Sequence, residues 1–159
     1  MIITEDTWEK IVRYYNDSKR TSMIGSVNSE GQPNVTPIGT LVLRDDCSGY
    51  YFDLFTRELS DNLDQNGKVC VLVIETGNLF WFKSLYTNKC AKPSGIKLIG
   101  FAGDRRKASP EEIQLLRSKI KPMKMFKGYQ TIFGNLSYVR DLKFTDYFMI
   151  NTGKMTFNL

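Results

Sequence analysis

The chain has 159 residues, a hydrophobic fraction of 42% and a net charge of +5. This length predicts one domain spanning residues 1–159, and its 10 Phe and 8 Tyr residues favour a packed globule over a disordered chain. The absence of histidine excludes a histidine-based general acid or base and a haem-ligating histidine within this chain.

The first predicted element is a helix that starts after Thr4. Thr4 is a suitable N-cap and two acidic residues follow it in the first turn. Trp8, Ile11, Val12 and Tyr15 recur at helical spacing, which predicts one apolar face packed on the rest of the protein.

Four strands with turns between them are predicted next. Gly31 and Pro33 belong to a polar cluster between two apolar runs, which is typical of a hairpin. Gly67 is a suitable end for a short helix that begins near Ser60. The predicted strands span residues 23–27, 34–43, 50–55 and 69–74.

The second half alternates apolar and basic segments. Leu79–Phe82 is predicted as an aromatic strand, 83–94 as a polar excursion and 96–102 as a long strand. Ser109 and Glu112 form the pattern of a capping box, which predicts a helix ending at Pro122. Residues 129–133 and 136–140 fit either two strands or a helix and a strand. The last strand is expected within 141–151, before a short 155–157 tail.

Charge is distributed unevenly along the chain. Residues 1–82 carry seven basic and twelve acidic residues, whereas residues 83–143 carry fourteen basic and four acidic ones. A concentrated basic half suits an anionic partner, either a phosphorylated cofactor or nucleic acid, although a solvated lysine-rich face explains it equally well.

Targeting and metal-binding signals are missing from the sequence. The acidic start is unlike a signal peptide, and no run reaches the ~18 apolar residues of a membrane-spanning helix. We therefore expect a cytoplasmic protein. Cys47, Cys70 and Cys90 are widely spaced and form no C-x-x-C or Cys/His cluster, so no zinc site is expected.

Three ordered features resemble the pyridoxamine 5'-phosphate oxidase-like family, the FMN-binding split barrels. They are the opening hairpin of 24–27 and 31–37, the aromatic pair Tyr51-Phe52 followed by the polar stretch 56–60, and the segment 62–69 leading into an apolar strand. Residues 95–103 are a weaker match to the long strand that usually follows. The resemblance covers residues 1 to 107. It implies a mainly β (α+β) fold, namely a six-stranded antiparallel split β-barrel with peripheral helices, in a homodimer with FMN in two clefts between the subunits.

The resemblance also implies where FMN is held. The phosphate would lie on the stretch after the third strand, and the ring would lie along the second strand. Family members commonly carry a Ser-Arg-Lys-like triplet where this chain has Arg57-Glu58-Leu59, so one basic residue is missing, and a lysine from the basic second half could replace its charge. The expected phosphate contacts are Phe55, Thr56, Arg57, Ser60 and Asn62, and the expected ring contacts are Asn34, Val35, Thr36 and Pro37.

Ordinary structural roles compete with these assignments. Val35 could simply follow core alternation, and Thr56, Arg57 and Ser60 could form a surface turn. Trp81 could flank the flavin of a partner subunit, or fill the core or a dimer interface.

The function implied is that of a flavin-dependent oxidoreductase acting on a small molecule, with an electron donor such as NAD(P)H and no assignable catalytic residue. The chain cannot carry the Arg-x-His signature of pyridoxine phosphate oxidation. Two alternatives stay open: a non-catalytic flavin-binding or redox-sensing module, and a nucleic-acid binder in which aromatic residues alternate with lysines in 83–143.

Overall fold

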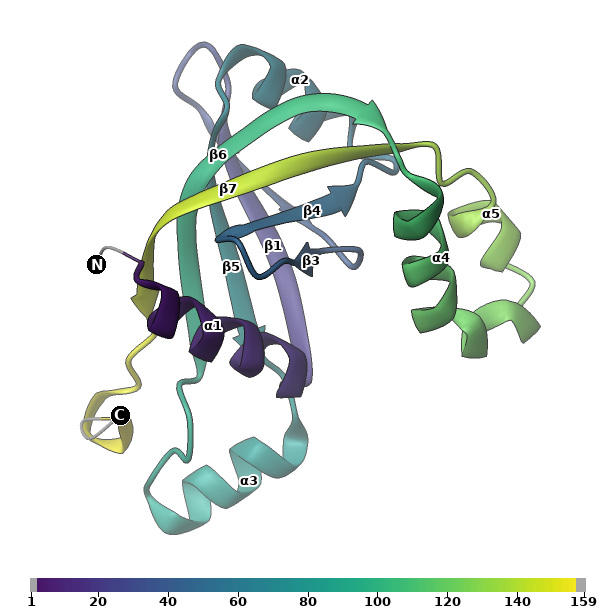
Figure 1. The fold of residues 1–159 in the computed structure, drawn as a ribbon. Coiled ribbons are helices and arrows are strands. Elements are labelled where there is room, and N and C mark those ends of the chain that lie inside the picture. Colours follow the sequence, from purple (N-terminus) through teal and green to yellow (C-terminus); the bar gives the residue numbers. More distant parts are fainter. Residues whose placement is uncertain (1–2, 157–159) are drawn as a thin grey trace.

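A computed structural model describes residues 3–156 and shows a strongly curved antiparallel sheet with helices around it (Figure 1). The strand order is β2-β1-β5-β6-β7-β4-β3. The strands are β1 (Arg20–Val27), β2 (Pro33–Pro37), β3 (Val42–Leu43), β4 (Ser48–Phe52), β5 (Lys68–Glu75), β6 (Gly95–Lys107) and β7 (Tyr138–Met149).

Five α-helices and two short 3-10 helices connect or flank these strands in the described residues. They are α1 (Glu5–Asp17), α2 (Arg57–Gln65), α3 (Asn78–Thr87), α4 (Pro110–Lys119), η1 (Lys121–Met125), α5 (Tyr129–Phe133) and η2 (Gly153–Thr156). None of the helices between residues 3 and 156 has the length and hydropathy that crossing a bilayer requires.

The mainly β architecture with peripheral helices is confirmed, with two corrections. The sheet has seven strands instead of six, and it is not closed. Both follow from an interruption of the predicted second strand, which ends at Pro37 and resumes only at Val42 as β3. Pro37 has no N–H to donate to a ladder, and one further backbone hydrogen bond to the β1 strand follows it, from the Ile38 N–H to the Ser22 carbonyl at 2.8 Å.

The interior of the curved sheet is the main core. Alternate residues of β1 and β5 point inward, as the period of two requires, and Trp8, Ile11 and Tyr15 of α1 pack onto them. Two hydrogen bonds fasten α1 to the β3 region, from Trp8 Nε1 to the Arg44 carbonyl (2.7 Å) and from the Tyr15 hydroxyl to the Leu41 carbonyl (2.6 Å). The predicted apolar face of the first helix is therefore a core face.

A second apolar cluster attaches α4 and α5 to the outside of β4 and β7. Tyr50 and Phe52 of β4 pack there against Leu116, Ile120 and Leu136. Tyr51 points to the opposite side and belongs to the main core. All three aromatic residues of β4 are consequently buried, because the strand lies between two apolar layers.

The strand predicted at Leu79–Phe82 is wrong, because this segment forms α3. Leu79, Phe82 and Tyr86 also recur at helical spacing, and short apolar runs suit either conformation. These three side chains are 71–84% exposed on the outer side of the helix. Trp81 is partly buried instead, and its Nε1 donates a hydrogen bond to the Glu75 carbonyl at 3.0 Å.

Other boundaries differ in smaller ways. The short helix begins at Arg57 and not near Ser60. Residues 129–133 are helical as α5, and the two segments predicted at 136–140 and 141–151 are one strand, β7. The capping box of Ser109 and Glu112 is confirmed at the start of α4. Phe157 of the predicted tail lies outside the described residues.

Long pairing between β6 and β7 depends on one glycine. A register shift occurs between Ile99 and Gly100. A Cβ atom at Gly100 would overlap the carbonyl oxygen of Lys143. Glycine is needed here because any side chain would push β7 away.

Candidate functional site

A pocket of about 300 Å³ lies where the end of β2 meets the end of β4. The predicted ring contact Pro37 and the predicted phosphate contacts Phe55 and Thr56 all line it. Phe52 and Phe133 contribute aromatic walls from β4 and α5. The fold thus brings together two parts of the expected FMN site that lie apart in the sequence.

The segment between β4 and α2 has an unusual backbone. Phe55 has a φ of 57°, in the left-handed region that residues other than glycine seldom adopt, and its side chain is 82% exposed. Thr56 follows as the residue that precedes α2, but its side chain makes no capping hydrogen bond. The first N–H groups of a helix have no intrahelical partner, so this uncapped end is suited to an anion.

Two of the predicted phosphate donors are already engaged by Asp53. Thr56 donates its hydroxyl hydrogen bond to one carboxylate oxygen of Asp53, and Ser60 donates to the other at 2.5 Å. Arg105 Nε lies 3.1 Å from the same carboxylate, whose side chain is 4% exposed. The negative charge of Asp53 is therefore balanced by Arg105, and the two hydroxyls serve to hold that carboxylate.

Arg57 has the opposite character. Its side chain is 96% exposed, and the ion pair it makes within residues 3–156 is with Asp61, at 3.8 Å. A pair at that distance and exposure contributes little, so the guanidinium is available to an incoming anion. Glu58, one residue later in the first turn, is also exposed and adds a negative charge that a phosphate must avoid.

Asn62 has a role inside the fold. Its side chain is buried and donates a hydrogen bond to Ser26 Oγ at 3.1 Å, which fastens α2 to β1. Ser26 is the cross-strand neighbour of Asn34, so α2 lies beside the start of β2. Asn34 and Thr36 lie on this inner side of β2.

Val35 points to the other side of the sheet and is 62% exposed. It forms a cross-strand row with Gly25, Cys70 and Ile99 on the outer face of β2, β1, β5 and β6. A groove of about 590 Å³ runs over this row. The four predicted ring contacts are thus divided between the two faces of one edge strand.

Arg140 is a buried cation beside this site that sequence reasoning missed. Its side chain is 1% exposed and lies across the pairing of β4 and β7 from Tyr51. It donates hydrogen bonds to the Gly103 carbonyl at 3.0 Å, to Asp64 at 2.6 Å and to Ser60 at 3.3 Å. The only sequence signal was a charged residue directly after the apolar pair Tyr138-Val139.

This part of the interior is under-satisfied in hydrogen bonds. The Arg140 Nε and the Tyr51 hydroxyl have no hydrogen-bond partner among residues 3–156. Buried polar groups are normally paired, and unpaired ones cluster at places where water or a ligand is bound. Among the described residues no three His, Cys, Asp or Glu side chains are grouped to hold a metal ion.

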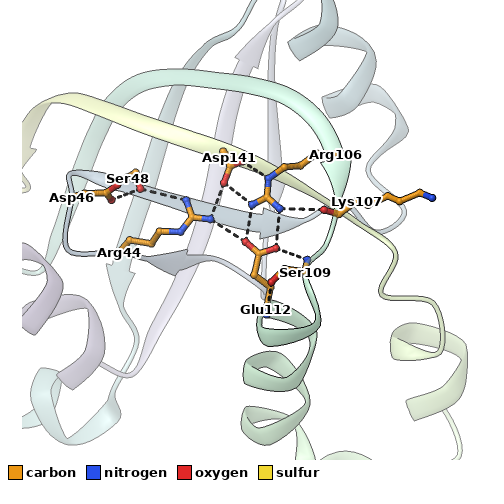
Figure 2. Close-up of polar contacts among 8 residues, drawn as sticks. All are labelled: Arg44, Asp46, Ser48, Arg106, Lys107, Ser109, Glu112 and Asp141. Atoms are coloured by element: carbon orange, nitrogen blue, oxygen red, sulfur yellow. Dashed lines mark hydrogen bonds and ion pairs between the residues drawn. The ribbon is translucent and has the colours of Figure 1, made fainter.

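A network of four charged side chains fastens the start of α4 to β6 and β7 (Figure 2). Arg106 binds Asp141 at 2.5 and 2.9 Å and Glu112 at 2.7 and 2.9 Å. Arg44 binds the same two carboxylates at 2.8 and 3.0 Å. Hydrogen bonds from Arg106 are the main reason why the pKa values of Glu112 and Asp141 lie below their ordinary range.

The residues at the first pocket fit the phosphate end of FMN in a restricted way. Of the expected phosphate contacts, only Phe55 and Thr56 line this pocket; Arg57, Ser60 and Asn62 do not. The first N–H groups of α2 and the exposed Arg57 guanidinium follow Thr56 directly in the chain and can meet an anion, whereas the hydroxyls of Thr56 and Ser60 are held by Asp53. Apolar side chains and the backbone of residues 37–40 line the rest of the pocket. A flat ring attached to a charged tail suits this combination.

Comparison with known proteins identifies the family and the fold of this chain. Residues 7–152 match the family model described as pyridoxamine 5'-phosphate oxidase. No match was found among curated protein sequences.

Solved structures with the same fold are numerous but distant in sequence. An FMN-binding protein from Syntrophomonas wolfei subsp. wolfei is 16% identical with a TM-score of 0.61, over 91% of this chain and 86% of that one. HupZ of Group A Streptococcus is 17% identical with a TM-score of 0.60, over 96% and 97%. HutZ, the heme storage protein from Vibrio cholerae, is 13% identical with a TM-score of 0.57, over 89% and 92%. At these identities the structures establish the fold, and the family model, which spans most of the chain, shows that the protein belongs to the pyridoxamine 5'-phosphate oxidase family.

Proposed function

We propose that this protein binds FMN and acts as a flavin-dependent oxidoreductase on a small molecule, as a homodimer. The observation that carries the proposal is the meeting of the β2 end with the uncapped start of α2 in one pocket. Pro37, an expected ring contact, and Phe55 and Thr56, two expected phosphate contacts, line this one pocket. The protein named as FMN-binding among the similar structures supports the same cofactor.

Arg57, Arg105 and the first N–H groups of α2 would hold the phosphate. Asp53 would not repel it strongly, because Arg105 already pairs with that carboxylate. Phe52, Phe55 and the backbone of residues 37–40 would border the ring and exclude water from it. Bound flavin supplies hydride or electron transfer, and this chain supplies position and surroundings.

A haem function like that of the heme storage protein is less well supported. The commonest protein ligand of haem in binding proteins is histidine, and this sequence contains none. Flavin binding makes no such demand, since it relies on hydrogen bonds and an apolar wall.

The homodimer rests on the outer face of the sheet. Met23, Cys70, Leu72, Ile99 and Phe101 form an apolar group on this face beside Lys68 and Lys97, and Phe101 is 51% exposed. An exposed apolar surface bordered by polar residues is typical of an interface between protein chains. Its groove over Gly25 would accept side chains of the second subunit.

The first test is spectroscopic. Protein incubated with FMN and freed of excess cofactor should retain a yellow chromophore in stoichiometric amount. Bleaching by NAD(P)H and recovery in air would identify an oxidoreductase, whereas a stable colour with no bleaching by any donor tried would identify a non-catalytic module. A colourless protein that binds single-stranded nucleic acid with steep salt dependence would contradict the proposal.

Arg57→Ala is expected to weaken FMN binding by more than tenfold. A charge-assisted hydrogen bond contributes roughly 1.5–3 kcal/mol, and the substitution removes it without disturbing a side chain that is 96% exposed. Quenching of flavin fluorescence on titration measures the affinity. Riboflavin, which lacks the phosphate, is the matched control ligand, and its affinity should not change. Equal losses for FMN and riboflavin would remove Arg57 from the phosphate site.

Phe101→Glu is expected to convert the dimer to a monomer at micromolar concentration. The substitution places a charge at a half-exposed position of the outer face, where burial against a second copy would leave it unpaired. Sedimentation velocity measures the change. Phe82→Glu, at an exposed site on α3, is the control and should leave the dimer intact. A monomeric unsubstituted protein would overturn this part of the proposal.

A further inference from the structure

A second pocket, of about 500 Å³, adjoins the first on the other side of residues 37–40. The two share Pro37, Ile38, Gly39, Thr40 and Ile120 as lining residues. The second pocket is bordered by the start of β1, the segment between β2 and β3, and the C-terminal end of α4. A molecule in it would lie next to whatever occupies the first.

Two cations line this second pocket and no carboxylate does. Arg20 comes from the start of β1 and Lys119 from the last position of α4. Neither side chain forms an ion pair in the described part of the chain. They are positioned by the fold at one cavity, although they lie far apart in the sequence.

Arg20 is held in place by neutral groups. Its guanidinium carbon lies 3.5 Å from the centroid of the Tyr15 ring, and one of its nitrogens donates a hydrogen bond to the Ser18 carbonyl at 3.1 Å. A guanidinium has five N–H donors, so most of them stay available. The stacking fixes the charge in position without neutralising it.

The pKa of Lys119 is affected by its place in this pocket. Burial lowers the pKa of its ammonium group, and the positive charge of Arg20 lowers it further. Two like charges at one cavity raise the energy of the free protein, and solvent screens part of this repulsion because Lys119 is an exposed residue. An anion placed between them would relieve that repulsion.

The remainder of the pocket is mixed in character. Leu41, Val42, Leu116 and Ile120 are buried apolar side chains on its wall, and Thr21 and Ser22 add hydroxyl groups. An apolar wall next to a pair of cations suits a small molecule with an apolar body and one anionic group.

We propose that Arg20 and Lys119 form the binding site for the carboxylate or phosphate group of a small substrate whose apolar body extends along Leu116 and Ile120 toward the first pocket. Calling the bound molecule a substrate rests on the proposed flavin function, because the second pocket lies beside the site expected for the flavin ring. The anion site itself is a property of this chain that can be measured without flavin.

The test is ligand binding to the flavin-free protein. Phenyl phosphate and benzoate are the anionic probes, and benzyl alcohol is a neutral molecule of similar shape. Isothermal titration calorimetry is expected to detect both anions and to show at least tenfold weaker binding of benzyl alcohol. Tighter binding of phenyl phosphate would identify a phosphate ester as the natural group, and tighter binding of benzoate would identify a carboxylate.

Arg20→Gln and Lys119→Gln are each expected to weaken binding of the preferred anion at least tenfold. Lys121→Gln is the matched control, because Lys121 is an exposed neighbour that does not line the pocket. NMR of isotopically methylated lysines adds a direct readout, in which the anion should raise the pKa of Lys119 and leave that of Lys121 unchanged.

The proposal is overturned if neither anion binds, if benzyl alcohol binds as well as they do, or if Lys121→Gln weakens binding as much as Lys119→Gln. These outcomes are independent of flavin binding, which is read from the FMN spectrum of the same preparation. A yellow protein without anion binding would refute only this inference. A protein that binds phenyl phosphate but never FMN would refute only the proposed function.

Discussion

Arg140→Ala is expected to lower the free energy of unfolding by about 3–5 kcal/mol, because it leaves a cavity and unpaired groups in the interior. The Arg140 side chain is 1% exposed and connects β7 to α2 through Asp64 and to β6 through the Gly103 carbonyl. Truncation deprives that carbonyl of its donor and releases the C-terminal half of α2. Urea unfolding followed by circular dichroism measures the loss.

Two further variants separate the causes of that loss. Arg140→Met keeps most of the side-chain volume but none of the donors, so it should fall between alanine and the unsubstituted protein. Arg117→Ala, at an exposed position of α4, should change stability by less than about 0.5 kcal/mol. Similar values for Arg140→Ala and Arg117→Ala would show that the buried arginine does not hold the sheet to α2.

Acid is expected to loosen the attachment of α4. The pKa values of Glu112 and Asp141 are lowered in the folded protein, chiefly by hydrogen bonds from Arg106. Their stabilising contribution is therefore fully present above the carboxyl pKa values of the unfolded chain, which are about 4. It is lost as the pH falls through the lower values of the folded state.

The measurement is the free energy of unfolding between pH 6 and pH 2. Each extra proton bound by the unfolded chain adds a slope of about 1.4 kcal/mol per pH unit in this window. The double variant Glu112→Gln with Asp141→Asn should be less stable at pH 6 and should lose much of this slope. Glu30→Gln, in the exposed turn before β2, should keep the slope of the unsubstituted protein. A double variant with an unchanged slope would place the acid sensitivity elsewhere.

Local signals in the sequence predicted most elements correctly. The spacing of Trp8, Ile11 and Tyr15 gave the buried face of α1, and the box of Ser109 and Glu112 gave the start of α4. Both rest on contacts within a few residues, which a sequence displays directly. The segment Leu79–Phe82 failed because its apolar spacing fits a strand and a helix equally well, and only the packing against Glu75 and its neighbours decides between them.

The candidate site was predictable in position more than in detail. The stretch after the aromatic strand does border a pocket shared with the end of β2. The contact between Thr56 and Asp53 is local in the chain, but no motif in the sequence pointed to it. Arg105 and Arg140 could not be predicted either, since they reach Asp53 and Ser60 only through the non-local pairing of β6, β7 and β4.

The interruption between Pro37 and Val42 has a consequence for the behaviour of the protein at high concentration. Both free margins of the sheet are formed by β2 and β3, which are short and consecutive in the chain. One margin carries a proline at each end and the other is only two residues long, so neither offers a row of N–H and C=O groups on which a foreign strand could grow. The interruption that leaves the sheet open therefore also protects its two edge strands from pairing with other molecules.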